Sequence, residues 1–275
     1  MVAGYNIHLV ENRQYFEPYI DIGMECMQIK KTKMMEKIKE YAIEGIADGT
    51  KIQKDWFPQI DADIFISHSH KDEKLAIGLA GWLYETFRLD CFVDSCVWGY
   101  ADDLLKIVND KYSDKKEGKE GEAIYNYQKC ITASKHVDTI LTIALHKMID
   151  KSEVTFLLNT DNSILKYKNI YDNATYSPWI YSEIICTEIV RKKKISEYRD
   201  RPFALEYMEH KDNVGQDEFS TAYDVSLDHL KDIYYVDLLK WKKDFCNSKF
   251  DYPLDCLYRF TYKEACNITD ESLFR

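Results

Sequence analysis

The segment Asp61-Ala62-Asp63-Ile64-Phe65-Ile66-Ser67-His68-Ser69-His70-Lys71-Asp72 decides the fold class of this chain. Its apolar run ends abruptly in small polar residues, which is typical of a buried strand that leads into a loop. Apolar residues at helical spacing follow from Leu75 to Thr86, with Asp72 able to cap this helix and Glu73 in its first turn. The segment therefore predicts a strand, a loop and a helix in direct succession.

A second unit of the same kind follows. Residues 91–94 predict a short strand, Ser95 to Tyr100 a loop, and residues 104–108 part of a helix. Alternating strands and helices predict a parallel sheet with helices on both faces, which binds its ligands at the carboxyl ends of the strands. Ser67 and Asp94 both fall at such ends.

A helix with a well-defined start occurs later, at Ser177-Pro178-Trp179-Ile180-Tyr181-Ser182-Glu183. Ser177 is a good N-cap and Pro178 suits the first helical position. Trp179 and Glu183 are one helical turn apart, so they share a face. Taken alone, this stretch is best interpreted as an ordinary amphipathic helix with Glu183 on its solvated side.

Together these motifs resemble the TIR domain, the Toll/interleukin-1 receptor-like fold, and specifically its NAD-cleaving branch. Residues 63–67 are similar to the opening strand of the family, and residues 92–94 to its second strand with the terminal Asp. Ser95 to Asp102 takes the place of the BB loop of the family. Residues 179–183 match the Trp-x-x-x-Glu helix that carries the catalytic Glu, so the resemblance implies that Glu183 is catalytic.

The resemblance implies a flavodoxin-like parallel sheet flanked by helices, formed by residues 61–210. A charged loop and a helix are inserted in it near residues 113–150. Residues 1–60 and 211–275 are predicted to be helical extensions. The sequence contains no internal repeat or long linker, so we expect one compact unit.

Several elements are predicted around these motifs. Within the domain they are a glycine-punctuated loop at residues 113–121, a long helix at 137–150, a strand at 154–159 and a second loop at 159–175. Outside these motifs they are a helix at residues 23–48, a last strand at 203–205 and two further helices at 227–241 and 254–260.

One carboxylate is enough to cleave the bond between ribose and nicotinamide in NAD+. This bond already carries a cationic leaving group, so it needs no general acid, whereas glycosidases usually use two carboxylates. Glu183 is expected to hold the ribose hydroxyls and to stabilise the positive charge that develops at the anomeric carbon. We therefore expect NAD+ as the substrate and no separate cofactor.

Five residues are candidates for substrate binding: Ser67, His68, Asp94, Trp98 and Trp179. Trp98 and Trp179 could pack on flat nicotinamide or adenine rings, although a loop-tip Trp98 suits self-association equally well. For Asp94, capping of the following turn is the favoured local interpretation. His68 and His70 have no acidic or cysteine ligand at zinc-like spacing, so we expect them in a polar pocket or at the surface and predict no metal site.

Composition excludes some other classes. A formal charge of −10 and a pI near 5.3 argue against non-specific nucleic-acid binding, which depends on positive charge. No apolar run is long enough to span a bilayer and no secretion signal is present, so we expect a cytoplasmic protein without a membrane partner. The eight cysteines include no Cys-x-x-Cys pair, so we expect reduced thiols.

The resemblance is closest to microbial stand-alone TIR proteins such as those of Thoeris-type antiviral defence. It implies a diffusible ADP-ribose product that activates a separate effector, and self-association through Ser95 to Asp102. Two alternatives stay open. The chain could be a non-catalytic TIR interaction module, with Glu183 solvated, or a nucleoside hydrolase or transferase that uses one carboxylate on ribose.

Overall fold

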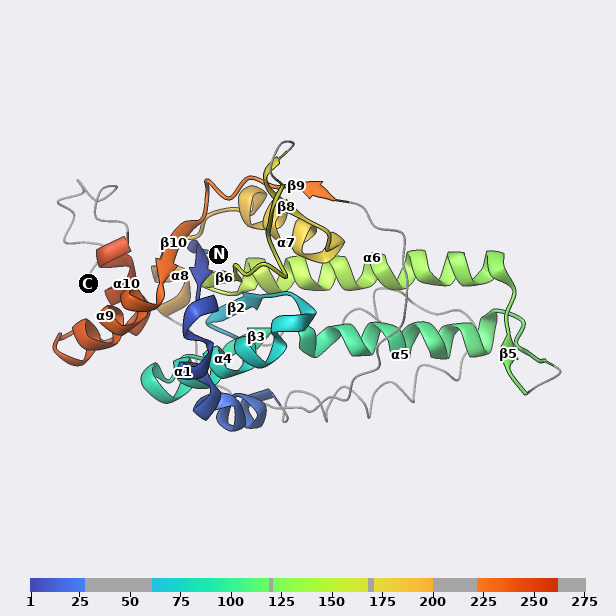
Figure 1. Ribbon diagram of the computed structural model, residues 1–275, viewed down its shortest axis with the longest axis horizontal. Helices are drawn as coiled ribbons and strands as arrows, with labels where there is room; N and C mark the ends of the chain where they lie inside the picture. Colours follow the sequence, from blue (N-terminus) through green and yellow to red (C-terminus); the bar gives the residue numbers. More distant parts are fainter. Residues whose placement is uncertain (28–60, 119–120, 168–170, 200–221, 262–275) are drawn as a thin grey trace.

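A central sheet of five parallel strands organises the computed structural model, which describes residues 1–27, 61–118, 121–167, 171–199 and 222–261 (Figure 1). The strand order is β10-β1-β6-β2-β3, and every neighbouring pair is parallel. The strands are β1 (Ala3–His8), β2 (Ile64–Ser67), β3 (Cys91–Val93), β6 (Val154–Leu158) and β10 (Lys231–Tyr234). The predicted α/β class, with a parallel sheet flanked by helices, is confirmed.

The sheet includes strands from both predicted extensions. β1 lies between β6 and β10, with Tyr5 opposite both Phe156 and Lys231. The prediction of purely helical extensions at residues 1–60 and 211–275 is therefore wrong. The sequence of β1, Ala-Gly-Tyr-Asn-Ile-His, is poor in strand-forming residues, so its conformation is set by burial between its two neighbours.

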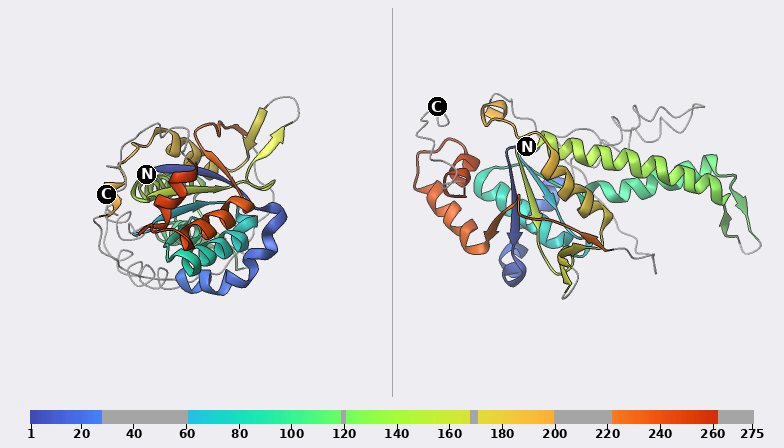
Figure 2. Two further views of the ribbon diagram at one scale, coloured as in Figure 1. Left: turned by 90° about the vertical axis from the view of Figure 1, so that its left-hand side faces the viewer. Right: turned by 90° about the horizontal axis from the view of Figure 1, so that it is seen from above.

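Helices cover both faces of the sheet (Figures 1 and 2). Successive strand residues point to opposite faces, so Ile64 and Ile66 of β2 join one apolar core and Phe65 joins the other. The first core is formed with α1 (Arg13–Phe16), α4 (Glu73–Phe87), α9 (Tyr235–Cys246) and α10 (Pro253–Thr261). The opposite face is covered by α5 (Ser95–Tyr112), α6 (Tyr127–Lys151) and α7 (Pro178–Ile189).

The N-terminal segment packs closely on α4. Gly81 of α4 faces the backbone of Tyr19, and a Cβ atom at Gly81 would lie 2.0 Å from the Tyr19 carbonyl oxygen. Tyr19 belongs to a short 3-10 helix, η2 (Glu17–Tyr19), which follows α1. This close approach makes the N-terminal segment part of the domain core.

Two helices extend beyond the sheet as an arm. α5 and α6 run side by side away from the strands, and a small hairpin of β4 (Lys116–Glu117) and β5 (Ala123–Ile124) joins them (Figures 1 and 2). The predicted loop from Ser95 to Asp102 forms the first turns of α5, so this prediction is wrong. The helix includes Gly99, and one glycine within a helix costs only about 1 kcal/mol, which neighbouring turns can offset.

The predicted loop at residues 159–175 is also wrong in part. It contains β7 (Leu165–Tyr167) and β8 (Tyr171–Thr175), which form a small antiparallel sheet with β9 (Tyr223–Asp224). The predicted helix at 227–241 is wrong in its first half, which forms a turn and then β10, and residues 235–241 are helical as part of α9. The predicted helix at 254–260 is confirmed as α10.

Two predictions lie outside the described residues. These are the strand at 203–205 and all but the first turn of the helix at 23–48. Among the residues that are described, no helix has the length and apolar character needed to cross a membrane.

Candidate functional site

Glu183 lies on the inner face of α7. The predicted start of this helix is confirmed, because the Ser177 hydroxyl accepts a hydrogen bond from the Ile180 amide at 3.2 Å and Pro178 follows as the first helical residue. Glu183 comes in the second turn and is only 2% exposed. The interpretation of Glu183 as a solvated helix residue is therefore wrong.

Ser67 connects this glutamate to the sheet. It is the last residue of β2, and its hydroxyl donates a hydrogen bond of 2.6 Å to Oε2 of Glu183. Both side chains are buried. The carboxyl end of strand β2 is thereby joined to α7.

His68 and Asp94 complete a buried cluster at the ends of the adjacent strands β2 and β3. Nδ1 of His68 contacts Oδ1 of Asp94, and neither side chain is exposed to solvent. Asp94 precedes α5 but makes no side-chain capping hydrogen bond, so the capping interpretation is wrong. Its carboxyl group faces inward, toward His68 and Glu183, instead.

Burial dominates the electrostatics of this cluster. It raises the pKa of Glu183 well above the usual range, and the nearby Asp94 carboxylate raises it further. Hydrogen bonding from Ser67 and the charge of His68 act in the opposite direction. Burial also raises the pKa of Asp94, whereas it lowers the pKa of His68 to about 4. Two carboxyl groups in such a site cannot both ionise easily, so they hold a proton at pH values where solvated carboxyls are charged.

The cluster is not fully satisfied by the protein. Glu183 is hydrogen-bonded to Asp94 only while one of the two carboxyl groups holds a proton, and the hydroxyl of Ser95 has no hydrogen-bond partner among the described residues. Ser95 is the first residue of α5 and is 2% exposed. A buried polar atom without a partner costs about 1–3 kcal/mol, so the hydroxyl of Ser95 is a candidate for contact with a ligand or an ordered water.

Of the two tryptophans predicted to bind substrate, the structure describes the side chain of Trp179 but not that of Trp98. Trp179 is half-buried and packs against the apolar core between the sheet, α5 and α6. Trp98 lies in the second turn of α5, and its side chain is outside the described part of the chain. The roles of both in substrate binding stay predictions.

A second polar group at the same edge of the sheet was not predicted. Asp72 is 1% exposed and accepts hydrogen bonds from the Thr160 hydroxyl at 2.5 Å and the Asn162 amide at 3.0 Å. Arg13 pairs with it at 2.8 Å. Asp72 does not cap α4 through its side chain, contrary to expectation. No local pattern could connect Arg13 to Asp72, because they are 59 positions apart and meet only through the sheet.

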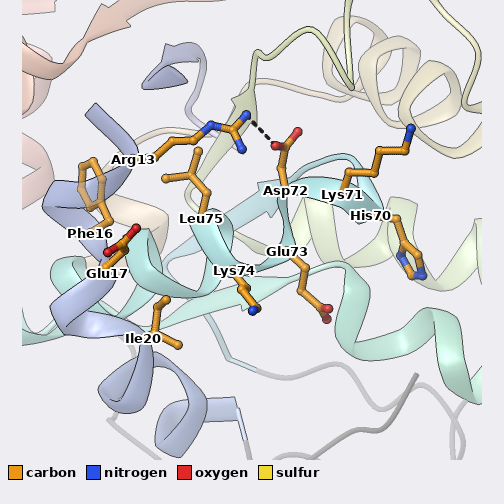
Figure 3. A pocket seen from close by; sticks show the side chains of 10 residues that line it. All are labelled: Arg13, Phe16, Glu17, Ile20, His70, Lys71, Asp72, Glu73, Lys74 and Leu75. Carbon is orange, nitrogen blue, oxygen red and sulfur yellow. Dashed lines mark ion pairs between the residues drawn. The ribbon is translucent and has the colours of Figure 1, made fainter. Parts of the chain in front are cut away.

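A pocket of about 580 Å³ opens beside this group (Figure 3). His70 lies in its wall, as a pocket-lining or surface histidine was expected to do. The negative charges of Glu73 and Asp72, in the same wall, raise the pKa of His68 against the larger lowering effect of burial. The lining residues are Arg13, Phe16, Glu17, Ile20, His70, Lys71, Asp72, Glu73, Lys74 and Leu75.

An ion-pair network lies at the opposite end of the sheet. Arg199 of α8 (Ser196–Arg199) donates two hydrogen bonds to Glu153, at 2.6 and 2.8 Å, and pairs with Asp255 of α10. The Tyr258 hydroxyl also donates to Glu153, at 2.8 Å. Burial tends to lower the pKa of Arg199, but the hydrogen bonds to Glu153 and Asp255 outweigh it and raise this pKa. We interpret the network as structural.

Comparisons with known proteins identify no relative of this chain. No family model matches it, and neither the curated proteins nor the solved structures provide a significant match. Among the described residues, no group of three or more His, Cys, Asp or Glu side chains is arranged to hold a metal ion.

Proposed function

We propose that this chain is a TIR-type NAD+ glycohydrolase or cyclase in which Glu183 is the catalytic residue. One observation carries the proposal: Glu183 is 98% buried at the carboxyl ends of parallel strands, where it bonds Ser67 and adjoins Asp94 and His68. A buried carboxylate is costly, and perturbed carboxyls in α/β proteins cluster at reaction centres. We therefore favour a catalytic role for Glu183 over the non-catalytic interaction module.

The ionised form of Glu183 performs the reaction in this proposal. Glu183 accepts hydrogen bonds from the ribose hydroxyls, and its charge stabilises the oxocarbenium-like transition state. The bond between C1′ and the pyridinium nitrogen breaks, and its electron pair neutralises the leaving nicotinamide. Water then bonds to C1′ and releases a proton, which gives ADP-ribose; attack by an adenine nitrogen instead gives a cyclic isomer.

The wider role follows from the resemblance to microbial TIR proteins. We propose that the product is a diffusible signal for a separate effector protein in antiviral, specifically antiphage, defence, and that the enzyme acts in the cytoplasm. The proposed self-association now concerns the first turns of α5 instead of a free loop, since Ser95 to Asp102 are helical. A change in how α5 begins would act directly on Asp94 and Ser95.

The deciding experiment is to express the full chain with and without viral challenge and to analyse NAD+ and every ADP-ribose species by mass spectrometry. We expect free nicotinamide and an ADP-ribose derivative to accumulate together. NAD+ that stays constant under all conditions would favour an interaction module instead. A release of bases from simple nucleosides at the same rate would favour a nucleoside hydrolase or transferase.

The rate should depend on pH through Glu183, and Ser67→Ala should shift this dependence. The reactive form is ionised, so activity rises as pH rises through the raised pKa of Glu183. Ser67 donates to the carboxylate and so lowers this pKa; its removal raises the pKa and moves the acid limb to higher pH. We expect about a tenfold loss of kcat at neutral pH that is regained in part at higher pH.

The control for this experiment is Ser134→Ala, on the outer half of α6. Its pH–rate profile should match that of the wild type. An unchanged acid limb in Ser67→Ala would show that the hydrogen bond to Glu183 has no part in setting the profile.

A further inference from the structure

We propose that Asp94 is a positioning residue that keeps the single proton of the buried carboxyl pair on Glu183, so that the chain holds Glu183 in the form that does not cleave NAD+. The inference rests on the proposed function, since it concerns the regulation of the same site. It assigns the proton to one of two carboxyl groups and predicts the direction in which each neighbour of Glu183 shifts the activity.

The first argument is that the two carboxyl groups share a hydrogen bond. Glu183 lies on α7 and Asp94 directly precedes α5, and both side chains are at least 98% buried. Hydrogen bonding between the two groups contributes to the pKa of each. Two carboxylates have no proton to place between them, so this bond requires that one of the groups is protonated. The group that lacks the proton carries the negative charge of the site.

The second argument is the distribution of hydrogen-bond donors around the pair. Nδ1 of the His68 ring contacts Oδ1 of Asp94. Burial raises the pKa of Asp94, and hydrogen bonding from the backbone of His68 and of Ser95 lowers it. Glu183 has one donor in the described part of the chain, the hydroxyl of Ser67 at 2.6 Å. Each donor stabilises the carboxylate that accepts from it, so the charge belongs on Asp94 and the proton on Glu183.

The other titratable groups around the pair do not reverse this assignment. At the end of β2, His68 is neutral at physiological pH because burial lowers its pKa to about 4. On α7 itself, Cys186 stays a thiol because burial raises its pKa to about 12. Asp72 and Glu73, from the turn that begins α4, act on His68 and add only negative charge. The proton therefore stays within the carboxyl pair.

Asp94 and Ser67 consequently act on Glu183 in opposite directions. The charge of Asp94 disfavours the ionised form of Glu183, whereas the hydroxyl of Ser67 favours it. Glu183 becomes reactive when its proton leaves to solvent, which requires a higher pH or a change at Asp94. Because Asp94 is joined directly to the first turn of α5, a movement of that turn on self-association would change the charge next to Glu183.

The experiment measures kcat for nicotinamide release from NAD+ across pH, for the full chain and for Asp94→Asn. Asparagine keeps the shape of the side chain, can accept from His68 and can donate to Glu183, but carries no charge. We expect the acid limb to lie at least about one pH unit lower and kcat on that limb to rise about tenfold, because a neighbouring carboxylate strongly raises a carboxyl pKa. Asp103→Asn, at an exposed position of α5, should keep the wild-type profile.

Infrared spectroscopy of the wild-type chain locates the proton without any reaction. With 13C in the side-chain carboxyl groups of glutamate alone, the C=O band of a buried, protonated carboxyl group should shift at neutral pH. With the label in aspartate alone, the band should stay in place. The band should be absent from Glu183→Gln, which identifies its source.

The outcomes separate the inference from the proposed function. An acid limb that is unchanged or lies at higher pH in Asp94→Asn would overturn the inference, and so would a protonated band that follows the aspartate label. The expected glutamate band without nicotinamide release from either protein at any pH would overturn the proposed function and leave the proton on Glu183. The infrared result decides the position of the proton even if Asp94→Asn does not fold.

Discussion

Glu183→Gln should lower kcat for nicotinamide release by about 10³-fold or more, with a much smaller effect on KM. Glutamine keeps the volume of the side chain and an oxygen that can accept from Ser67, so the ground-state contacts survive. What is lost is the negative charge opposite the anomeric carbon, which matters most in the transition state. Steady-state kinetics of the purified variant would measure both parameters.

The same substitution should not destabilise the protein. The pKa of Glu183 is raised in the folded state, so the folded state binds more protons than the unfolded state, and stability falls as pH rises above the unfolded pKa. Glutamine removes this loss and can donate to Asp94. We therefore expect a Tm equal to or above that of the wild type at neutral pH, by calorimetry.

Glu188→Gln is the matched control, because Glu188 lies exposed on the same helix. It should leave kcat, KM and Tm as in the wild type. A folded Glu183→Gln variant with wild-type kcat would exclude Glu183 as the catalytic residue. A large fall in Tm would mean instead that the carboxylate is held for stability.

Arg199→Met should produce the largest loss of stability, about 3–5 kcal/mol, because it leaves a buried charge without its partner. The side chain of Glu153 is 4% exposed, and Arg199 supplies two of its hydrogen bonds while also pairing with Asp255. Chemical denaturation would measure the change, and a Tm lower by roughly 10 °C should accompany it.

Arg191→Met provides the comparison for this prediction. Arg191 also pairs with a glutamate, Glu197, at 2.8 Å, but both side chains are exposed to solvent. Its removal should leave Tm unchanged within error, because exposed ion pairs contribute little. Similar losses in the two variants would show that burial of the Arg199 network has no energetic importance.

The parts of the fold that could be predicted are those with a local pattern. Strand β2 and helix α4 follow from an apolar run, polar residues and helical spacing within 27 positions. The start of α7 follows from Ser177 and Pro178, whose effects act within one helical turn. The position of Glu183 in the second turn follows from the same pattern, whereas its hydrogen bond to Ser67 joins residues 116 positions apart and has no local signal.

The errors have a common physical cause. β1 has no strand pattern of its own and is extended because it completes the sheet between β6 and β10. Asp94 was expected to cap the following turn, but its carboxyl group instead contacts His68, the residue directly after the neighbouring strand β2. The Arg13–Asp72 pair depends on the same long-range assembly. Tertiary contacts outweighed local preference in each case.

The position of β1 has a consequence for synthesis on the ribosome. Residues 3–8 are made before the other strands of the sheet, yet one of their two pairing partners, residues 231–234, is made more than 220 positions later. At about 5–20 residues per second, the first strand waits on the order of 10–45 s for the last one. During that time its apolar side chains and one free edge are exposed on the nascent chain, where chaperones can bind them and premature pairing has to be prevented.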